Sequence, residues 1–186
     1  IDSNKHIVTI IDDNVEIAGF TIKNCSTGYS GIRIYNNYCN IHNNIIKFCG
    51  GGIELFYTDN NHVHNNIITN NLWGVFIDGS EDIIIGNNSL SGNIYGIEIG
   101  FSKNQIIDNS IIWNHLIGVL QIYSDNNDII CNNISFNSDI GIQFLISKKN
   151  RLLDSQVIDN KIGVKLDGGA ERNNFNYCLF ENSLSD

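Results

Sequence analysis

Three carboxylates occupy related places in the sequence and could do chemistry together. Glu54, Asp78 and Glu98 each lie two or four residues after a glycine that opens an apolar segment. Two carboxyl groups on either side of a glycosidic bond can serve as acid and base in its hydrolysis. A group of carboxylate oxygens can also bind Ca²⁺. Which of these is open to the protein depends on the elements that position the three side chains.

Three histidines form a second group that could bind a ligand. His62 and His64 flank a single valine, and His42 lies one repeat earlier in the sequence. Imidazole nitrogens are common ligands of Zn²⁺ and Cu²⁺. The sequence therefore indicates a candidate transition-metal site at His42, His62 and His64, with ordinary surface histidines as the alternative.

A repeat of 21 to 23 residues sets the positions of all these side chains. Within each copy apolar residues alternate with polar ones, as in Ile53, Glu54 and Leu55, and this alternation is typical of a strand with one buried face. Two further short apolar segments, centred near Val63 and Ile68 in one copy, recur in the others. The repeats begin near Gly31, Gly52, Gly74, Gly96, Gly118, Gly141 and Gly163.

Three short strands in a repeat of this length fit one turn of a solenoid. We predict an all-β fold, a right-handed single-stranded parallel β-helix with about eight coils of about 22 residues. Coils that stack at ~4.8 Å would build a rod on the order of 40 Å long. Residues 1–186 are expected to form a single domain. Neither end shows the pattern of a capping helix, which favours a fragment of a longer chain or caps provided by a partner.

Asparagine fills recurring columns of this predicted solenoid. Stacked side-chain amides can hydrogen-bond along the axis and satisfy the backbone of the turns. Cys25 and Cys49 stand at the start of one column, where we predict a pair of buried thiols, with a disulfide or a thiolate metal site as alternatives. That column reads Cys25, Cys49, Asn71, Asn93, Asn114, Asn137, Asn160 and Asn182.

In this fold Glu54, Asp78 and Glu98 would lie on three successive coils, on the outer face of one sheet. Neighbouring members would be about 8 Å apart, a separation that suits an inverting carboxylate pair. The alternative is a solvated face on which Arg33 pairs with Glu54 across adjacent coils. The histidines would belong to a different sheet. The residues expected to frame a sugar site are Arg33, Tyr35, Phe56, Tyr57 and Phe76.

Charge and composition exclude several classes of partner. The formal net charge is −9, with only 11 Lys and Arg residues, which argues against nucleic acids and anionic membranes. No apolar run approaches the ~18 residues of a membrane-spanning helix, and no signal peptide is visible. Proline is absent, as expected of uninterrupted ladders that use every backbone N–H.

The repeated form NNxIxxNxxxGIxI resembles the NosD-like family of parallel β-helix repeat proteins. The family is also described as CASH domains with PbH1-type repeats, and the resemblance covers about residues 14–182. It implies a secreted or cell-surface protein, and relatives include polysaccharide lyases, hydrolases and a copper-site maturation factor. The RIK motif of pectin hydrolases and the DPHD motif of epimerases do not occur in this sequence.

These observations favour a carbohydrate-interacting module of a secreted or cell-surface protein, with a polysaccharide or glycan as partner and without evident catalysis. A polysaccharide lyase or glycoside hydrolase acting at Glu54, Asp78 and Glu98 is one alternative. A structural rod, adhesin or tailspike-like spacer is another, and a copper-binding maturation factor is a third. No cofactor is certain, with Ca²⁺ or a transition metal as the candidate ligands, and the oligomeric state stays open.

Overall fold

The computed structural model describes residues 5–182, which form three parallel sheets of eight strands each. The first sheet contains β1 (Val8–Ile10), β4 (Ser30–Ile34), β7 (Gly51–Phe56), β10 (Trp73–Asp78), β13 (Tyr95–Gly100), β16 (Ile117–Ile122), β19 (Ile140–Leu145) and β22 (Ile162–Asp167). The second contains β2 (Glu16–Ala18), β5 (Asn40–His42), β8 (His62–His64), β11 (Glu81–Gly86), β14 (Lys103–Ile107), β17 (Asp128–Ile130), β20 (Arg151–Leu153) and β23 (Asn174–Asn176). The third contains β3 (Thr21–Lys23), β6 (Ile45–Lys47), β9 (Ile67–Thr69), β12 (Ser89–Ser91), β15 (Ser110–Ile112), β18 (Asn133–Ser135), β21 (Gln156–Ile158) and β24 (Leu179–Glu181).

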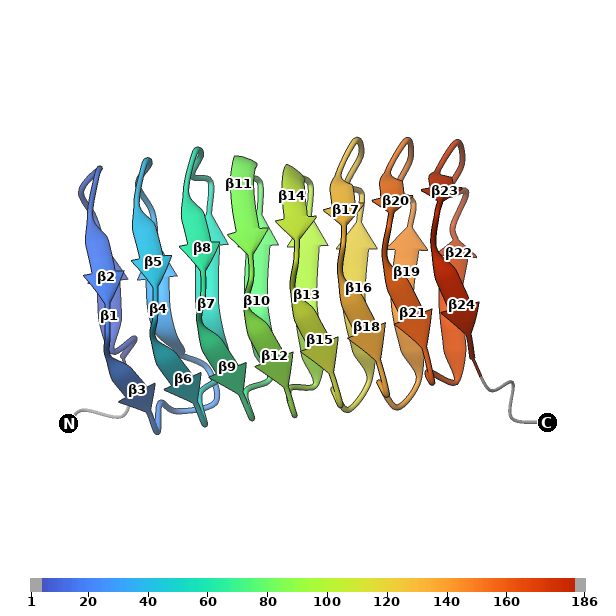
Figure 1. Cartoon of the computed structure of the whole chain (residues 1–186). Coiled ribbons are helices and arrows are strands. Elements are labelled where there is room, and N and C mark those ends of the chain that lie inside the picture. Colours follow the sequence, from blue (N-terminus) through green and yellow to red (C-terminus); the bar gives the residue numbers. More distant parts are fainter. Residues whose placement is uncertain (1–4, 183–186) are drawn as a thin grey trace.

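Each turn of the solenoid contributes one strand to every sheet, and the turns stack side by side from the N-terminus to the C-terminus (Figure 1). We number these turns coil 1 (β1 to β3) to coil 8 (β22 to β24). The predicted parallel β-helix of eight coils with three short strands each is confirmed. Within residues 5–182 no helix is long and apolar enough to span a membrane.

Apolar side chains from all three sheets meet inside the coils. In the first sheet Leu55 is paired in register with Ile77, which is paired with Ile99, and all three are fully buried. Because strand side chains alternate between the two faces, the residues between them point to the outer face. The core is therefore a set of apolar columns that run along the solenoid axis.

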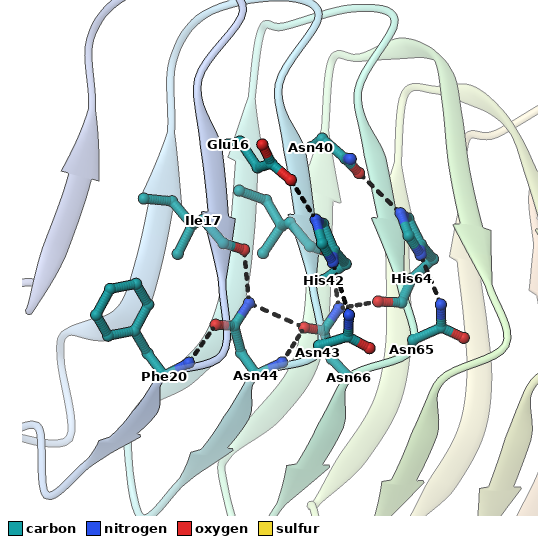
Figure 2. A network of polar contacts seen from close by, with 11 residues as sticks. Glu16, Ile17, Phe20, Asn40, His42, Asn43, Asn44, His64, Asn65 and Asn66 are labelled. Carbon is teal, nitrogen blue, oxygen red and sulfur yellow. Dashed lines mark hydrogen bonds and ion pairs between the residues drawn. The ribbon is translucent and has the colours of Figure 1, made fainter.

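The predicted asparagine column is confirmed and forms a continuous hydrogen-bonded ladder. Asn71 Oδ1 accepts the backbone N–H of Cys49 at 3.0 Å, and Asn71 Nδ2 donates to Asn93 Oδ1 at 3.1 Å. A second ladder joins Asn44 to Asn66 in the same way (Figure 2). These bonds satisfy buried amides and turn backbone together, which explains the abundance of asparagine.

A third ladder at the turn between the first and second sheets was not predicted. Asn127 Nδ2 donates to Asn150 Oδ1 at 3.1 Å, and the backbone N–H of Ser102 donates to Ser124 Oγ at 3.2 Å beside it. The asparagine series is interrupted by Cys39 and Ile83 in two coils. This interruption hides the column from an inspection of the sequence.

The repeated glycine has a steric cause. A Cβ atom on Gly74 would lie 2.4 Å from the carbonyl oxygen of Gly96 in the next coil and 3.1 Å from Asn93 Nδ2. Such contacts leave no room for a side chain, so the close approach of successive coils requires glycine at this corner.

The structure corrects the prediction for Cys25 and Cys49. Their sulfur atoms form a disulfide bond of 2.05 Å, not a pair of buried thiols. The two residues are adjacent in their column because coils 1 and 2 stack directly, and this brings their Cα atoms within 4.4 Å. Proximity alone could not decide the oxidation state, and the disulfide was one of the alternatives.

One inward position does not follow the apolar rule. Gln121 of β16 lies in register between Ile99 and Phe144 and is fully buried. Neither its Nε2 nor its Oε1 has a hydrogen-bond partner within residues 5–182. An unpaired buried amide is costly, which makes Gln121 a weak point of the core.

Candidate functional site

The predicted outer columns of the first sheet are confirmed by its register. Arg33 of β4 is paired with Glu54 of β7, which is paired with Phe76 of β10, and Phe76 is paired with Glu98 of β13. A parallel column pairs Phe56 with Asp78, which is paired with Gly100. The first sheet therefore gathers acidic, basic and aromatic side chains on coils 2 to 5.

Arg33 connects the charged and aromatic parts of this face. Its Nη1 lies 3.6 Å from Glu54 Oε2, so the ion pair considered from the sequence is present. The guanidinium carbon lies 4.2 Å from the ring centroid of Phe56 and 5.3 Å from that of Tyr35. These are distances at which a cation is attracted to an aromatic face. Arg33 thus neutralises Glu54 and holds two rings in place.

Glu98 has a different environment on the same face. The indole N–H of Trp73 donates to Glu98 Oε2 at 2.7 Å. Burial raises the pKa of Glu98, the indole hydrogen bond lowers it, and the nearby negative charge of Asp78 raises it further, so the net direction is upward. Glu98 is therefore the carboxyl group of this face that retains its proton to a higher pH than usual.

An aromatic cluster lies between the two glutamates. The ring centroids of Phe56 and Phe76 are 5.3 Å apart, and those of Trp73 and Phe76 are 5.7 Å apart. Arg33 and Glu54 complete the lining of a recess of about 210 Å³. The recess presents ring surfaces beside charged hydrogen-bonding groups, an arrangement that suits a ligand with both apolar and hydroxyl surfaces.

The structure divides the three predicted carboxylates into two environments. The Asp78 carboxylate leans toward Gly100, where a Cβ atom would lie 3.1 Å from Asp78 Oδ1, and this places it near Glu98 on the same strand. The Glu54 side chain instead lies over Gly51, and its carboxylate faces Arg33. The charge of Asp78 acts on Glu98, whereas Glu54 is paired with Arg33.

Trp73 and His6 belong to this face but were not identified from the sequence. Trp73 stands immediately before the repeated glycine, and its side chain also points outward. The alternation in the sequence indicated outward side chains only after the glycine. His6 Nδ1 accepts the backbone N–H of Ser30 at 2.9 Å, and its Nε2 lies 3.0 Å from Arg33 Nη1. Burial and the charge of Arg33 lower the pKa of His6. Tyr57, in contrast, lies outside the recess and covers Gly79 at the corner of the coil.

Two of the three predicted metal-binding histidines lie together on the second sheet. The rings of His42 and His64 stack with centroids 4.9 Å apart (Figure 2). In each ring Nε2 donates a hydrogen bond to an acceptor and Nδ1 accepts one from a neighbouring asparagine. The partners are Glu16 and Asn43 for His42, and Asn40 and Asn65 for His64.

His62 stands two residues before His64 on β8, in register with Asn40 rather than with His42. Burial and the neighbouring imidazoles lower the pKa of His64. Among the described side chains no group of three or more His, Cys, Asp or Glu could hold a metal ion. Metal binding by the three histidines therefore stays a prediction.

Solved structures with a similar fold include two epimerases. The periplasmic alginate epimerase AlgG matches with a TM-score of 0.73 and 18% sequence identity over 95% of this chain and 45% of its own. The A-module of the mannuronan C-5 epimerase AlgE6 of Azotobacter vinelandii matches with a TM-score of 0.58 and 15% identity over 98% of this chain and 59% of its own. At these identities the likeness shows the fold alone.

Sequence comparisons place the chain in a family. No curated protein matches it significantly. The family model described as "Periplasmic copper-binding protein (NosD)" matches residues 11–185, which is nearly the whole chain. The chain belongs to the NosD family of parallel β-helix proteins.

Proposed function

We propose that this protein is a carbohydrate-binding β-helix module and that its binding surface is the outer face of the first sheet on coils 2 to 5. The observation that carries the proposal is the recess in which Phe56, Trp73 and Phe76 lie beside Arg33 and Glu54. Aromatic rings cover the apolar faces of a sugar, and charged side chains bind its hydroxyl groups. The fold shared with an alginate epimerase and a mannuronan C-5 epimerase agrees with a glycan partner.

The charge of the face favours an uncharged glycan. Arg33 is already paired with Glu54, so it is not a free cation for a uronate carboxylate. Asp78 and Glu98 add two acidic groups nearby. An anionic polysaccharide would be repelled by this arrangement, whereas a neutral one would find hydroxyl acceptors.

An extracytoplasmic location is part of this proposal. The Cys25–Cys49 disulfide is typical of oxidising compartments. The family description names a periplasmic protein, and one similar structure is a periplasmic enzyme. Extracted periplasm or culture medium should contain the protein with this disulfide intact, whereas recovery only from cytoplasm would contradict the location.

A binding experiment tests the proposed surface. A glycan array would first identify oligosaccharides that bind the wild-type chain. Calorimetry would then measure their affinity for the wild type and for the Trp73→Ala and Phe76→Ala variants. Each variant should bind at least about tenfold more weakly, because aromatic anchors at the centre of a site carry much of the affinity. Trp113→Ala is the matched control, since Trp113 stacks on Phe136 at another corner. Absence of any binding, or an equal loss in the control, would refute the proposed surface.

Hydrolysis or lyase chemistry on the same face is a second candidate function. Its specific support is the Asp78–Glu98 pair, in which a carboxyl group with a raised pKa lies near a second carboxylate, as in acid–base pairs that cleave glycosidic bonds. Turnover of a polysaccharide that disappears in both Glu98→Gln and Asp78→Asn would support it. Binding without turnover on a broad panel would leave the binding function alone.

Copper binding, which the family description names, has less support in this chain. The Nδ1 lone pairs of His42 and His64 already accept hydrogen bonds from asparagine amides. A metal would have to displace these partners. Copper titration of the wild-type chain and His64→Ala tests this function, because equal affinity in the two would exclude the histidine pair.

A further inference from the structure

One coil differs from its neighbours at the turn between the first and second sheets. In coil 6 the corner runs from Ser124 to Asn127, and in coil 5 the equivalent corner from Ser102 to Asn104, which includes the start of β14, is one residue shorter. The register between β11 and β14 shifts at the same place. The residue that coil 5 lacks has a left-handed backbone conformation in the neighbouring coils, where it is Asn126 in coil 6 and Asp82 in coil 4.

This shortened turn opens a gap in the outer surface. Asp82 and Asn126 stand on either side of a coil that has no equivalent residue between them. The hollow there has a volume of about 510 Å³, within the range of small-ligand sites. The lining residues that carry the argument are Tyr38, His62, Asp82, Gln105, Asn126 and Asp128.

A second hollow of about 320 Å³ continues around the corner of coil 5. Lys103 and Asn126 line both hollows, so the two lie side by side. The second hollow adds the exposed rings of Phe101 and Tyr123, whose centroids are 5.1 Å apart and nearly parallel. The combined surface therefore offers aromatic rings at one end and amides at the other.

The short turn also leaves a buried donor unused. In coil 6 the Asn127 amide donates to the carbonyl of Ser102 at 3.2 Å and to Asn150 Oδ1 at 3.1 Å. The equivalent Asn104 amide nitrogen is buried and has no partner within the described chain. Asn104 is itself a lining residue of the larger hollow. Removal of one residue has thus produced a cavity and an unpaired polar group at the same place.

Two of the four acidic residues that line the two hollows have their carboxylates engaged with the protein, and Glu81 and Asp82 line the hollows as well. Asp128 accepts the Nε–H of Arg151 at 2.6 Å, and Asp125 accepts the backbone N–H of Lys148 at 2.7 Å. Within residues 5–182 these carboxylates do not form, with other His, Cys, Asp or Glu side chains, a group that could hold a metal ion. Amides, a lysine and aromatic rings remain available, and these groups match hydroxyls and C–H faces better than a concentrated charge.

We propose that the gap at the shortened turn of coil 5 is a second binding site, separate from the recess on the first sheet, and that it takes a neutral saccharide. The amides of Gln105 and Asn126 would bind hydroxyl groups, with Tyr38 or the Phe101–Tyr123 stack against a sugar ring. This proposal does not depend on the function proposed for the first sheet.

Insertion of one asparagine between Lys103 and Asn104 tests the site. It restores the turn length of coil 6 and fills the gap without a change on the first sheet. The ¹⁵N-labelled chain would be titrated with neutral hexasaccharides of glucose, mannose and xylose, with oligogalacturonate as the charged comparison. In the wild type the backbone amide signals of Lys103, Gln105 and Asn126 should change their chemical shifts in a saturable way with a neutral probe. The insertion should abolish these changes.

Three further variants keep the outcome interpretable. Gln105→Ala, an exposed outward position, should weaken this binding by about tenfold if the insertion variant does not fold. An extra residue between Arg172 and Asn173 lengthens the equivalent turn in coil 8, away from the hollow, and should leave the binding unchanged. Trp73→Ala should also leave it unchanged, which separates this site from the recess.

The second site would be refuted by three results. One is the absence of shifts at Lys103, Gln105 and Asn126 with every neutral probe. Another is unchanged binding in both the insertion variant and Gln105→Ala. The third is tighter binding of oligogalacturonate than of any neutral probe.

Discussion

The inner and outer columns of the first sheet differ in how much they change from coil to coil. The inner column is apolar in almost every coil, as in the series Leu55, Ile77 and Ile99. The outer column beside it passes from Glu54 through Phe76 to Glu98 along the same strands. The inner residues build a uniform solenoid, and the individual chemistry of the protein lies on the outside, where the repeats differ.

The largest expected effect comes from breaking an inner ladder. Asn93→Ala would leave the Asn71 N–H and amide without their acceptor and would remove the bond to Asn114. Loss of several buried hydrogen bonds should lower the free energy of unfolding by about 3–5 kcal/mol. Urea denaturation measures it. Asn174→Ala, exposed on β23, is the control and should change stability by less than about 0.5 kcal/mol. Equal effects would contradict the structural role of the ladder.

The disulfide should have the next largest effect. Reduction of Cys25–Cys49, or Cys25→Ser with Cys49→Ser, should lower the free energy of unfolding by about 3 kcal/mol, because a closed loop restricts the unfolded chain. Thermal denaturation with and without reductant measures this change. Cys131→Ser, at an exposed free cysteine, should leave stability nearly unchanged. A protein insensitive to reductant would show that the bond is not formed.

Substitution of Gln121, the polar exception in the inner column, should raise stability instead of lowering it. Gln121→Leu removes a fully buried amide without partners and restores the apolar column. The free energy of unfolding should rise by about 1–3 kcal/mol. Gln143→Leu, which stands on the outer face beside Lys165, should give no such gain. A loss of stability in Gln121→Leu would mean that its amide has a function in the core.

The smallest expected effect is a pH dependence on the outer face. The pKa of Glu98 is raised in the folded protein, so the folded state binds more protons than the unfolded state between the ordinary and the raised pKa. Stability should therefore fall as pH rises through that window. Glu98→Gln keeps an acceptor for the Trp73 indole and should flatten this fall. Denaturation midpoints from pH 4 to pH 8 compare the two proteins, and identical slopes would contradict the shift.

The inner columns could be predicted from the sequence because they repeat. A period of about 22 residues with alternating apolar positions determines the strands, the coils and two of the three asparagine ladders together. The Arg33–Glu54 pair was also accessible, because both residues occupy one place in successive repeats. When a residue position repeats, the repeat shows whether its side chain points inward or outward and which residues of the adjacent coils lie beside it.

The outer chemistry was less predictable because it depends on side-chain rotamers and on irregular turns. The repeat spacing placed Asp78 on the outer face. It could not show that the charge of Asp78 acts on Glu98 or that Glu54 is paired with Arg33. Trp73 was missed because only positions after the glycine were considered. The short turn of coil 5 is a single missing residue, and its consequence for Asn104 emerges only when the coils are stacked.

The indole N–H signals of the two tryptophans test the central claim most directly. Trp73 lies in the recess of the first sheet, and Trp113 stacks on Phe136 at another corner. A neutral oligosaccharide that binds the proposed surface should shift the Trp73 indole signal in a saturable way and leave the Trp113 signal in place. In Gln105→Ala, where the second site is weakened, a Trp73 signal that does not move while the same sugar still binds the protein would contradict the account.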